Sequence, residues 1–187
     1  EWLPKTSTLK SVIFEQGSKT PLPGTLASQR KFANHESYNK MAGKYFENIK
    51  KYTKNGDMQP AYRDFLGHKF DATKEEDFRA VEEMWPAHLL VRGIQSRCNS
   101  VESFVTTRRT FSRTLATLTA CMYILSIGDR HLDNFLLDLK TGEVVGIDFG
   151  AAFGHAQSHL PIPEISPIRM SRQFTSILAP LETTKLL

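Results

Sequence analysis

Five polar residues that can take part in chemistry lie within six positions of one loop: Asp129, Arg130, His131, Asp133 and Asn134. A further carboxylate, Asp148, follows 14 residues after Asn134. A carboxylate can orient or deprotonate an attacking hydroxyl. Carboxylate and amide oxygens are also the hard ligands that Mg²⁺ prefers. Phosphoryl transfer asks little more of a protein, because its catalysis is mainly positioning and charge neutralisation.

The spacing of these residues favours the same chemistry. Asp129 and Asn134 are five residues apart, which is the Asp-to-Asn separation in the catalytic loop of protein kinases. Asp148 opens the triplet Asp-Phe-Gly, the place of the metal-holding aspartate in that template. An isolated Asp-Phe-Gly triplet is typical of an ordinary turn. The order and combination of the two motifs therefore carry the prediction.

Two short apolar runs connect the motifs and predict a β-hairpin. Phe135–Leu137 and Val144–Ile147 flank Leu139-Lys140-Thr141-Gly142, which has the composition of a turn. Such a hairpin would bring Asn134 and Asp148, at its two ends, side by side. The segment from Phe104 to Ile127 is apolar on most faces in its second half, which predicts a buried helix that leads into the loop.

The rest of the chain is mainly helical in pattern. Helices are predicted from Thr6 or Thr8 to Gly17, over His35–Tyr52, Pro60–Phe70 and Lys74–Trp85, from Pro86 to Cys98, and over Ser171–Leu178. Ser18–Arg30 is rich in Pro, Gly, Ser and Thr and predicts a loop. The fold class that follows is α+β, mainly α.

Composition limits the remaining possibilities. The chain has 187 residues, 40% of them hydrophobic, which suits one domain or a large part of one. No apolar run approaches the ~20 residues of a membrane span, and no signal peptide is recognisable. The net charge is +4, and the basic residues are scattered along the sequence. This distribution favours a solvated surface over a DNA-binding groove. Cys98 and Cys121 lack metal-binding spacing and are expected to be buried free thiols of a reducing compartment.

The loop Gly128-Asp129-Arg130-His131-Leu132, with Gly146-Ile147-Asp148-Phe149-Gly150, resembles the phosphatidylinositol-3-kinase-related protein kinases. Leu160-Pro161-Ile162-Pro163-Glu164 and Arg172-Gln173-Phe174 extend the resemblance, which covers nearly the whole chain. Within the family, the sequence is most similar to the members that repair DNA double-strand breaks by non-homologous end joining.

This resemblance implies the C-lobe of a catalytic domain of the phosphatidylinositol 3-/4-kinase type, with a short β-hairpin that carries the active site. The implied parts are a hinge at 1–5, a catalytic loop at 128–134 and an activation segment at 148–172. The glycine-rich loop and phosphate-binding lysine of the N-lobe are absent from the sequence, which also lacks a starting Met. The chain is therefore expected to be a fragment that is inactive and poorly soluble alone.

Residue roles follow from the same resemblance. Asp129 is expected to orient the acceptor hydroxyl, His131 to contact the terminal phosphate, and Asn134 and Asp148 to bind Mg²⁺, or Mn²⁺ in its place. The implied ATP-binding residues are Trp2, Leu3, Thr8, Leu136 and Ile147. The implied functional residues of the activation segment are Phe149, Gly150, Leu160, Ile162, Pro163 and Ile165. Asp133 stands where Asn is expected, and Ala151 where His is common.

The function that these features favour is a nuclear serine/threonine protein kinase of the DNA-damage response. It would transfer the γ-phosphate of ATP to Ser or Thr before Gln. Its implied partners are protein substrates and, through other regions, the Ku heterodimer and DNA ends; no membrane is implied. A lipid kinase is the first alternative. The absence of Lys and Arg from Asp148 to Ile168 argues against phosphorylated headgroups as substrates. An inactive scaffolding member is the second alternative.

Overall fold

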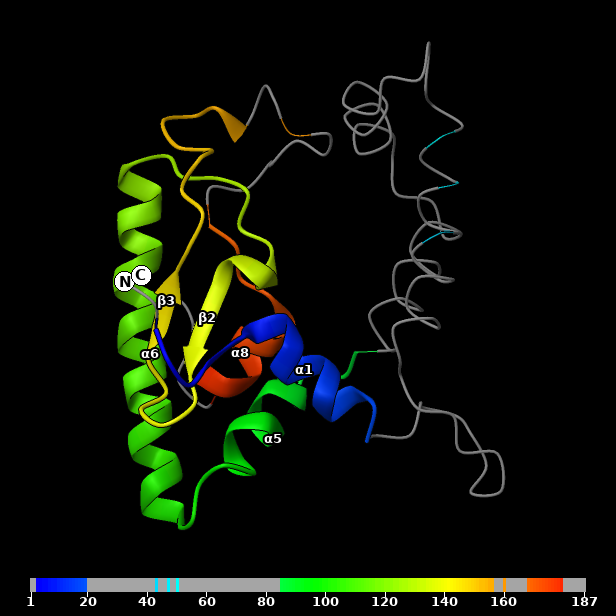
Figure 1. Ribbon diagram of the computed structural model, residues 1–187, viewed down its shortest axis with the longest axis vertical. Helices are drawn as coiled ribbons and strands as arrows, with labels where there is room; N and C mark the ends of the chain where they lie inside the picture. Colours follow the sequence, from blue (N-terminus) through cyan, green and yellow to red (C-terminus); the bar gives the residue numbers. More distant parts are fainter. Residues whose placement is uncertain are drawn as a thin grey trace.

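The computed structural model describes residues 3–19, 43, 47, 50, 85–156, 160 and 168–179. In chain order, these ranges contain β1 (Thr6–Thr8), α1 (Leu9–Gly17), α5 (Leu89–Gln95), α6 (Val101–Ile124), the 3₁₀ turn η2 (Leu132–Asn134), β2 (Phe135–Asp138), β3 (Val144–Gly146) and α8 (Arg172–Leu178). Figure 1 shows α6 running along β3, with α1, α5 and α8 gathered on the other side of the hairpin. The predicted helices 35–52, 60–70 and 74–85 lie outside the described residues, apart from helical positions 43, 47 and 50 and from Trp85, which lies in a bend and not in a helix.

The small sheet is antiparallel and has the strand order β1-β2-β3. The predicted hairpin is confirmed, with Leu136 opposite Val145. Its turn is built as the composition indicates: the Asp138 carboxylate accepts from the backbone N–H groups of Lys140 and Thr141, and Gly142 takes a φ of +81°. Strand β1 was not predicted from the sequence.

Hydroxyl side chains begin three of the helices. Thr8, Ser100 and Ser171 accept a hydrogen bond from the backbone N–H three residues later, at the starts of α1, α6 and α8. For α1 the sequence had left Thr6 and Thr8 as alternative first residues, and for α8 it had indicated Ser171. The helix predicted from Pro86 begins at Leu89 instead, because Pro86 accepts a hydrogen bond from Leu89 in a preceding turn. No helix in the described ranges is both long and apolar enough to cross a membrane.

Helix α6 ends at Ile124, three residues earlier than predicted. Ser126 has a φ of +49°, a left-handed conformation that cannot continue the helix. The prediction of two buried thiols is wrong for Cys121, which is exposed on α6. Cys98 is half-buried, and both are free.

Phe174 of α8 lies at the centre of the core and is fully buried. Its ring packs edge-on against Phe135 of β2, with a centroid separation of 5.8 Å, and lies 6.1 Å from the ring of Phe111 on α6. The core continues through apolar residues of every layer: Leu9, Val12, Ile13, Leu89, Leu90, Ile94, Leu115, Leu137, Val144, Ile177 and Leu178. Helix α8 thus packs the β2–β3 hairpin against α6. This packing supports the loop that connects α6 to β2.

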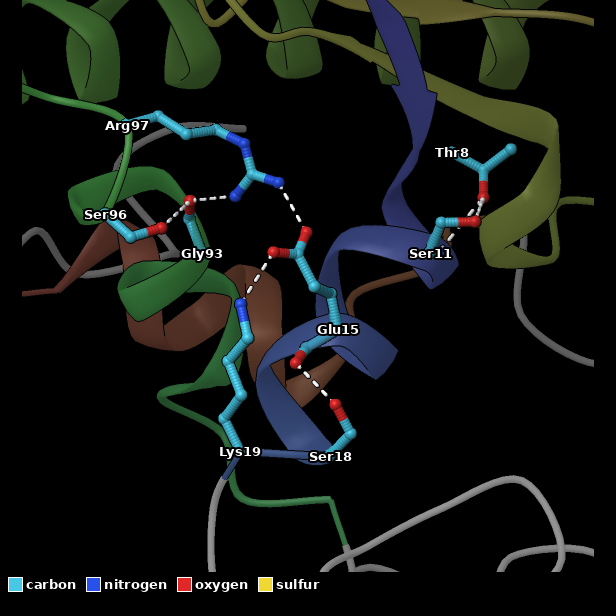
Figure 2. A network of polar contacts seen from close by, with 8 residues as sticks. All are labelled: Thr8, Ser11, Glu15, Ser18, Lys19, Gly93, Ser96 and Arg97. Carbon is cyan, nitrogen blue, oxygen red and sulfur yellow. Dashed lines mark hydrogen bonds and ion pairs between the residues drawn. The ribbon is translucent and has the colours of Figure 1, made fainter.

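An ion-pair network joins the C-terminal ends of α1 and α5 (Figure 2). The Glu15 carboxylate accepts from Lys19 at 2.8 Å and from Arg97 at 2.6 Å. Arg97 also donates to the Gly93 carbonyl at 2.5 Å, which satisfies an acceptor at the end of α5. The hydrogen bonds from Lys19 and Arg97 hold the pKa of the Glu15 carboxyl below its ordinary value of 4.5.

Glu15→Gln is expected to loosen the last turns of α1 and α5 slightly. The side chain of Glu15 is 45% exposed, so the pairs contribute only about 0.2–1 kcal/mol. Because the folded-state pKa is lowered, this contribution is present above pH 4.5 and is lost as the pH falls through the folded-state value. Hydrogen exchange of residues 9–19 and 89–98 should be faster in the variant at pH 7, and the difference should vanish in acid. An equal difference at both pH values would contradict this account.

Candidate active site

The loop that follows α6 leads directly into the hairpin. Gly128 is buried, η2 ends at Asn134, and β2 begins at the next residue. The backbone N–H of Ile147 donates to the Asn134 carbonyl at 3.1 Å, one step beyond the β2–β3 ladder. Asn134 and Asp148 therefore lie at the same end of the hairpin, as the sequence predicted.

Asn134 is held by a contact within the loop. Its side chain is buried, and its amide nitrogen donates to the backbone carbonyl of Asp129 at 2.7 Å. This bond uses the nitrogen of the amide, so the side-chain oxygen remains as its acceptor. The same bond fixes the loop where the Asp129 side chain emerges.

Arg130 joins the loop to the segment after β3. It is 5% exposed and donates to three backbone carbonyls, those of Gly128 at 2.7 Å, Ile147 at 2.9 Å and Asp148. Its guanidinium also lies 5.4 Å from the ring centre of Phe149. The planar guanidinium group of an arginine carries several N–H donors in fixed directions and can therefore bind this set of acceptors. Arg130 therefore connects the loop to the residues that follow β3.

Both candidate carboxylates have a left-handed backbone, with a φ of +59° at Asp129 and +54° at Asp148. Non-glycine residues adopt this conformation rarely, although Asp tolerates it better than most. Such strain persists only where surrounding contacts impose it, and it is common at functional sites. Here the contacts are those of Asn134 and Arg130, each of which binds the backbone carbonyl of one of these aspartates.

The side chains of Asp129 and His131 are solvent-accessible neighbours. Asp129 is 37% exposed and His131 is 51% exposed, and His131 Nε2 lies 4.0 Å from Asp129 Oδ1. Asp148 is also exposed, and its Oδ1 accepts a long hydrogen bond of 3.4 Å from the Gly150 backbone. The backbone is therefore fixed while the three polar side chains face solvent.

The glycine does not make the sharp turn at Asp148-Phe149-Gly150. The left-handed residue is Asp148 itself, whereas Gly150 is not in the left-handed region. Phe149, which follows Asp148, is not buried beneath the site. It is 47% exposed and lines an open groove between α6 and β3. A β-carbon at Gly146 would lie 3.0 Å from side-chain atoms of Leu118 and Met122 and 3.1 Å from the Phe149 ring, so the glycine leaves room for close packing here.

The expected ATP-binding residues are partly brought together. Thr8, Leu136 and Val145 are aligned across the three strands, on the face opposite buried Leu137 and Val144. Ile147 follows β3 and is 37% exposed. Val145 was not among the predicted site residues, because its place depends on strand register.

The other expected site residues are less informative. Leu3 is 37% exposed before β1, and Leu160 is half-buried. Trp2, Ile162, Pro163 and Ile165 lie outside the described residues.

Asp133, beside Asn134, contacts the start of α1. Its carboxylate accepts from Lys10 Nζ at 2.7 Å and from the Thr8 hydroxyl at 3.2 Å. Partial burial acts to raise the pKa of the Asp133 carboxyl. The hydrogen bond and the charge of Lys10 act in the opposite direction, together with the Thr8 hydrogen bond and the nearby His131. Their combined effect is larger, so the pKa is lowered. No sequence pattern predicts this pairing, because its members are more than a hundred residues apart.

Comparison with known proteins places this arrangement in a family. The sequence pattern of the family "Phosphatidylinositol 3- and 4-kinase" matches residues 1–187. The chain belongs to the phosphatidylinositol 3- and 4-kinase family. Its fold class, α+β and mainly α with a small antiparallel sheet, is confirmed for a kinase domain of this family.

The relatives of this kinase-family chain include proteins named as protein kinases. It is 38% identical over 191 residues to the DNA-dependent protein kinase catalytic subunit of Dictyostelium discoideum, with 100% of this chain covered, and 33% identical over 187 residues to that of Mus musculus. It spans 4% of the length of each. The serine/threonine-protein kinase SMG1 of Danio rerio is 36% identical over 54% of this chain and 3% of its own. These matches agree with the resemblance to the phosphatidylinositol-3-kinase-related protein kinases.

The fold is also present in a solved structure. The FAT and kinase domain of CtTel1 aligns with a TM-score of 0.66 and 24% identity, over 95% of this chain and 10% of that chain. The kinase-family fold is therefore supported by the three-dimensional comparison as well as by the sequence pattern.

Proposed function

We propose that this chain is the C-lobe of a serine/threonine protein kinase and carries its phosphoryl-transfer residues. The supporting observation is that Asn134 and Arg130 bind the backbones of Asp129 and Asp148, so that both motifs form one site. An N-lobe outside this chain would supply the glycine-rich loop and phosphate-binding lysine. The chain alone is then expected to lack activity.

The chemistry of the donor set fits Mg²⁺. The side-chain oxygen of Asn134 and the exposed carboxylate of Asp148 are hard ligands at one end of the hairpin. Within the described ranges, no cluster of three or more His, Cys, Asp or Glu residues could hold a metal by itself. Two protein ligands are enough for Mg²⁺ in a kinase, because substrate phosphates and water complete its shell. When bound, Mg²⁺ or Mn²⁺ would neutralise phosphate charge.

The remaining roles are assigned to residues of this chain. Asp129, exposed beside the loop, orients the acceptor hydroxyl and accepts its proton. His131, 4.0 Å from Asp129, contacts the terminal phosphate from the same side. Leu3, Thr8, Leu136 and Ile147 line the adenine site together with Trp2.

The whole protein is proposed to act in the nucleus, in the repair of DNA double-strand breaks by non-homologous end joining. Two relatives that align with 100% of this chain are named DNA-dependent protein kinase catalytic subunits. Recruitment by the Ku heterodimer and DNA ends would use regions outside this chain. The segment from Asp148 to Ile168 contains no Lys or Arg, which favours a neutral acceptor such as Ser-Gln over an acidic substrate.

A comparison of three substrates tests this proposal with the full-length protein. A Ser-Gln peptide is expected to be phosphorylated faster than the matched Ser-Ala peptide, because Leu160–Ile165 is proposed to form a pocket for the glutamine side chain. Equal peptide rates would contradict the glutamine preference.

Phosphatidylinositol is the third substrate, because the matching family pattern is named after lipid kinases. Preferential phosphorylation of the lipid would establish the alternative function. No transfer to any substrate, with ATP binding intact, would favour a scaffolding protein.

A further inference from the structure

Asp133 connects two parts of the chain that are far apart in sequence. It lies in η2 and binds Lys10 and Thr8, which are 123 and 125 residues away. Lys10 is the second residue of α1, and Thr8 is both the last residue of β1 and the cap of α1. The carboxylate therefore fastens η2 to the junction between β1 and α1.

The η2 turn needs such outside support. It has only three residues, and its backbone contributes a hydrogen bond from Asn134 to the His131 carbonyl, of 2.9 Å. A single 3₁₀ turn is a weak structure by itself. Its last residue is Asn134, so any movement of η2 moves the amide that binds the Asp129 carbonyl.

The partners of Asp133 are themselves held in place. The Thr8 hydroxyl accepts from the Ser11 backbone at 3.1 Å. Lys10 Nζ lies 5.9 Å from the ring centre of Phe14, one turn further along α1. Helix α1 is anchored by Leu9, Val12 and Ile13, which are almost fully buried. Asp133 is thus tied to a rigid element of the core.

We propose that Lys10 and Asp133 are positioning residues for phosphoryl transfer, which hold η2, and with it Asn134, against the start of α1. This inference rests on the proposed kinase function. Since β1 leads into α1 and pairs with β2, the same contact would link the nucleotide side of the site to the catalytic loop.

The test uses the full-length protein with Lys10→Met, Asp133→Asn and Asp133→Ala. Lys10→Met removes the ammonium group but keeps an unbranched apolar side chain. Asp133→Asn removes the negative charge but keeps an oxygen that can accept a hydrogen bond from Thr8. These two variants are expected to lower kcat about twofold to fivefold, since both ionic partners are more than a third exposed. Asp133→Ala is expected to cost about tenfold and to raise the Mg²⁺ concentration for half-maximal activity. Lys140→Met, which changes an exposed lysine of the hairpin turn, is the matched control.

Two further measurements separate positioning from general stability. Lys10→Met should have no added effect in the Asp133→Ala background, because the partner is already gone. Hydrogen exchange of residues 128–138, measured without nucleotide, should be faster in Lys10→Met than in Lys140→Met.

The inference is overturned if the wild type phosphorylates the Ser-Gln peptide while both Lys10→Met and Asp133→Ala leave kcat, Mg²⁺ dependence and exchange unchanged. Additive losses in the double variant would also overturn it. Phosphate transfer to no substrate by the wild type would instead refute the proposed function, and this inference with it.

Discussion

Asp148→Ala in the full-length protein is expected to lower kcat by about three orders of magnitude. The substitution removes the carboxylate proposed to hold Mg²⁺ against the phosphates, and loss of one electrostatic contributor commonly has an effect of this size. The fold should be kept, because Asp148 is exposed and Arg130 binds its backbone carbonyl, which alanine retains. Alanine also has to adopt the left-handed backbone at this position, at a modest cost in stability.

Turnover of the Ser-Gln peptide at saturating ATP measures this effect. Glu143→Gln is the matched control, because it also removes an exposed carboxylate of the hairpin, but at the far end of β3. Near-normal turnover in Asp148→Ala would remove this residue from the metal site.

Asp129→Asn is expected to lower kcat about 10³-fold, within the usual contribution of a general base. The amide is close in size to the carboxylate but cannot accept the proton of the hydroxyl. The backbone carbonyl that binds Asn134 is unchanged, and asparagine also tolerates a left-handed backbone. The site should therefore stay assembled.

The size of the loss is read from single-turnover transfer to the Ser-Gln peptide, with Glu143→Gln again as control. A rate within about tenfold of the wild type would assign the proton transfer to another group.

Local sequence signals were enough to predict several elements of the fold. The Leu139–Gly142 turn and its apolar flanks predicted the hairpin, and hydroxyl residues indicated the starts of α1 and α8. Strand β1 was missed because Thr-Ser-Thr has no apolar alternation. Its extended state comes from pairing with β2, which follows more than a hundred residues later.

Contacts between distant residues could not be predicted in the same way. Asp129 and Asp148 were found from motif spacing, but their left-handed backbones depend on what Arg130 and Asn134 bind. The pairing of Asp133 with Lys10 likewise exists only because α1 packs against η2. Sequence patterns predicted which residues would carry the chemistry, whereas the folded chain determines which contacts hold those residues in place.

The central claim is that one site uses Asp148 for the metal and Asp129 for the acceptor hydroxyl. ATP affinity with and without Mg²⁺, measured for the full-length wild type, Asp129→Asn and Asp148→Ala, tests this division most directly. Mg²⁺ should tighten ATP binding equally in the wild type and Asp129→Asn, and much less in Asp148→Ala. An equal effect of Mg²⁺ on all three proteins, or its loss in Asp129→Asn alone, would contradict the assignment.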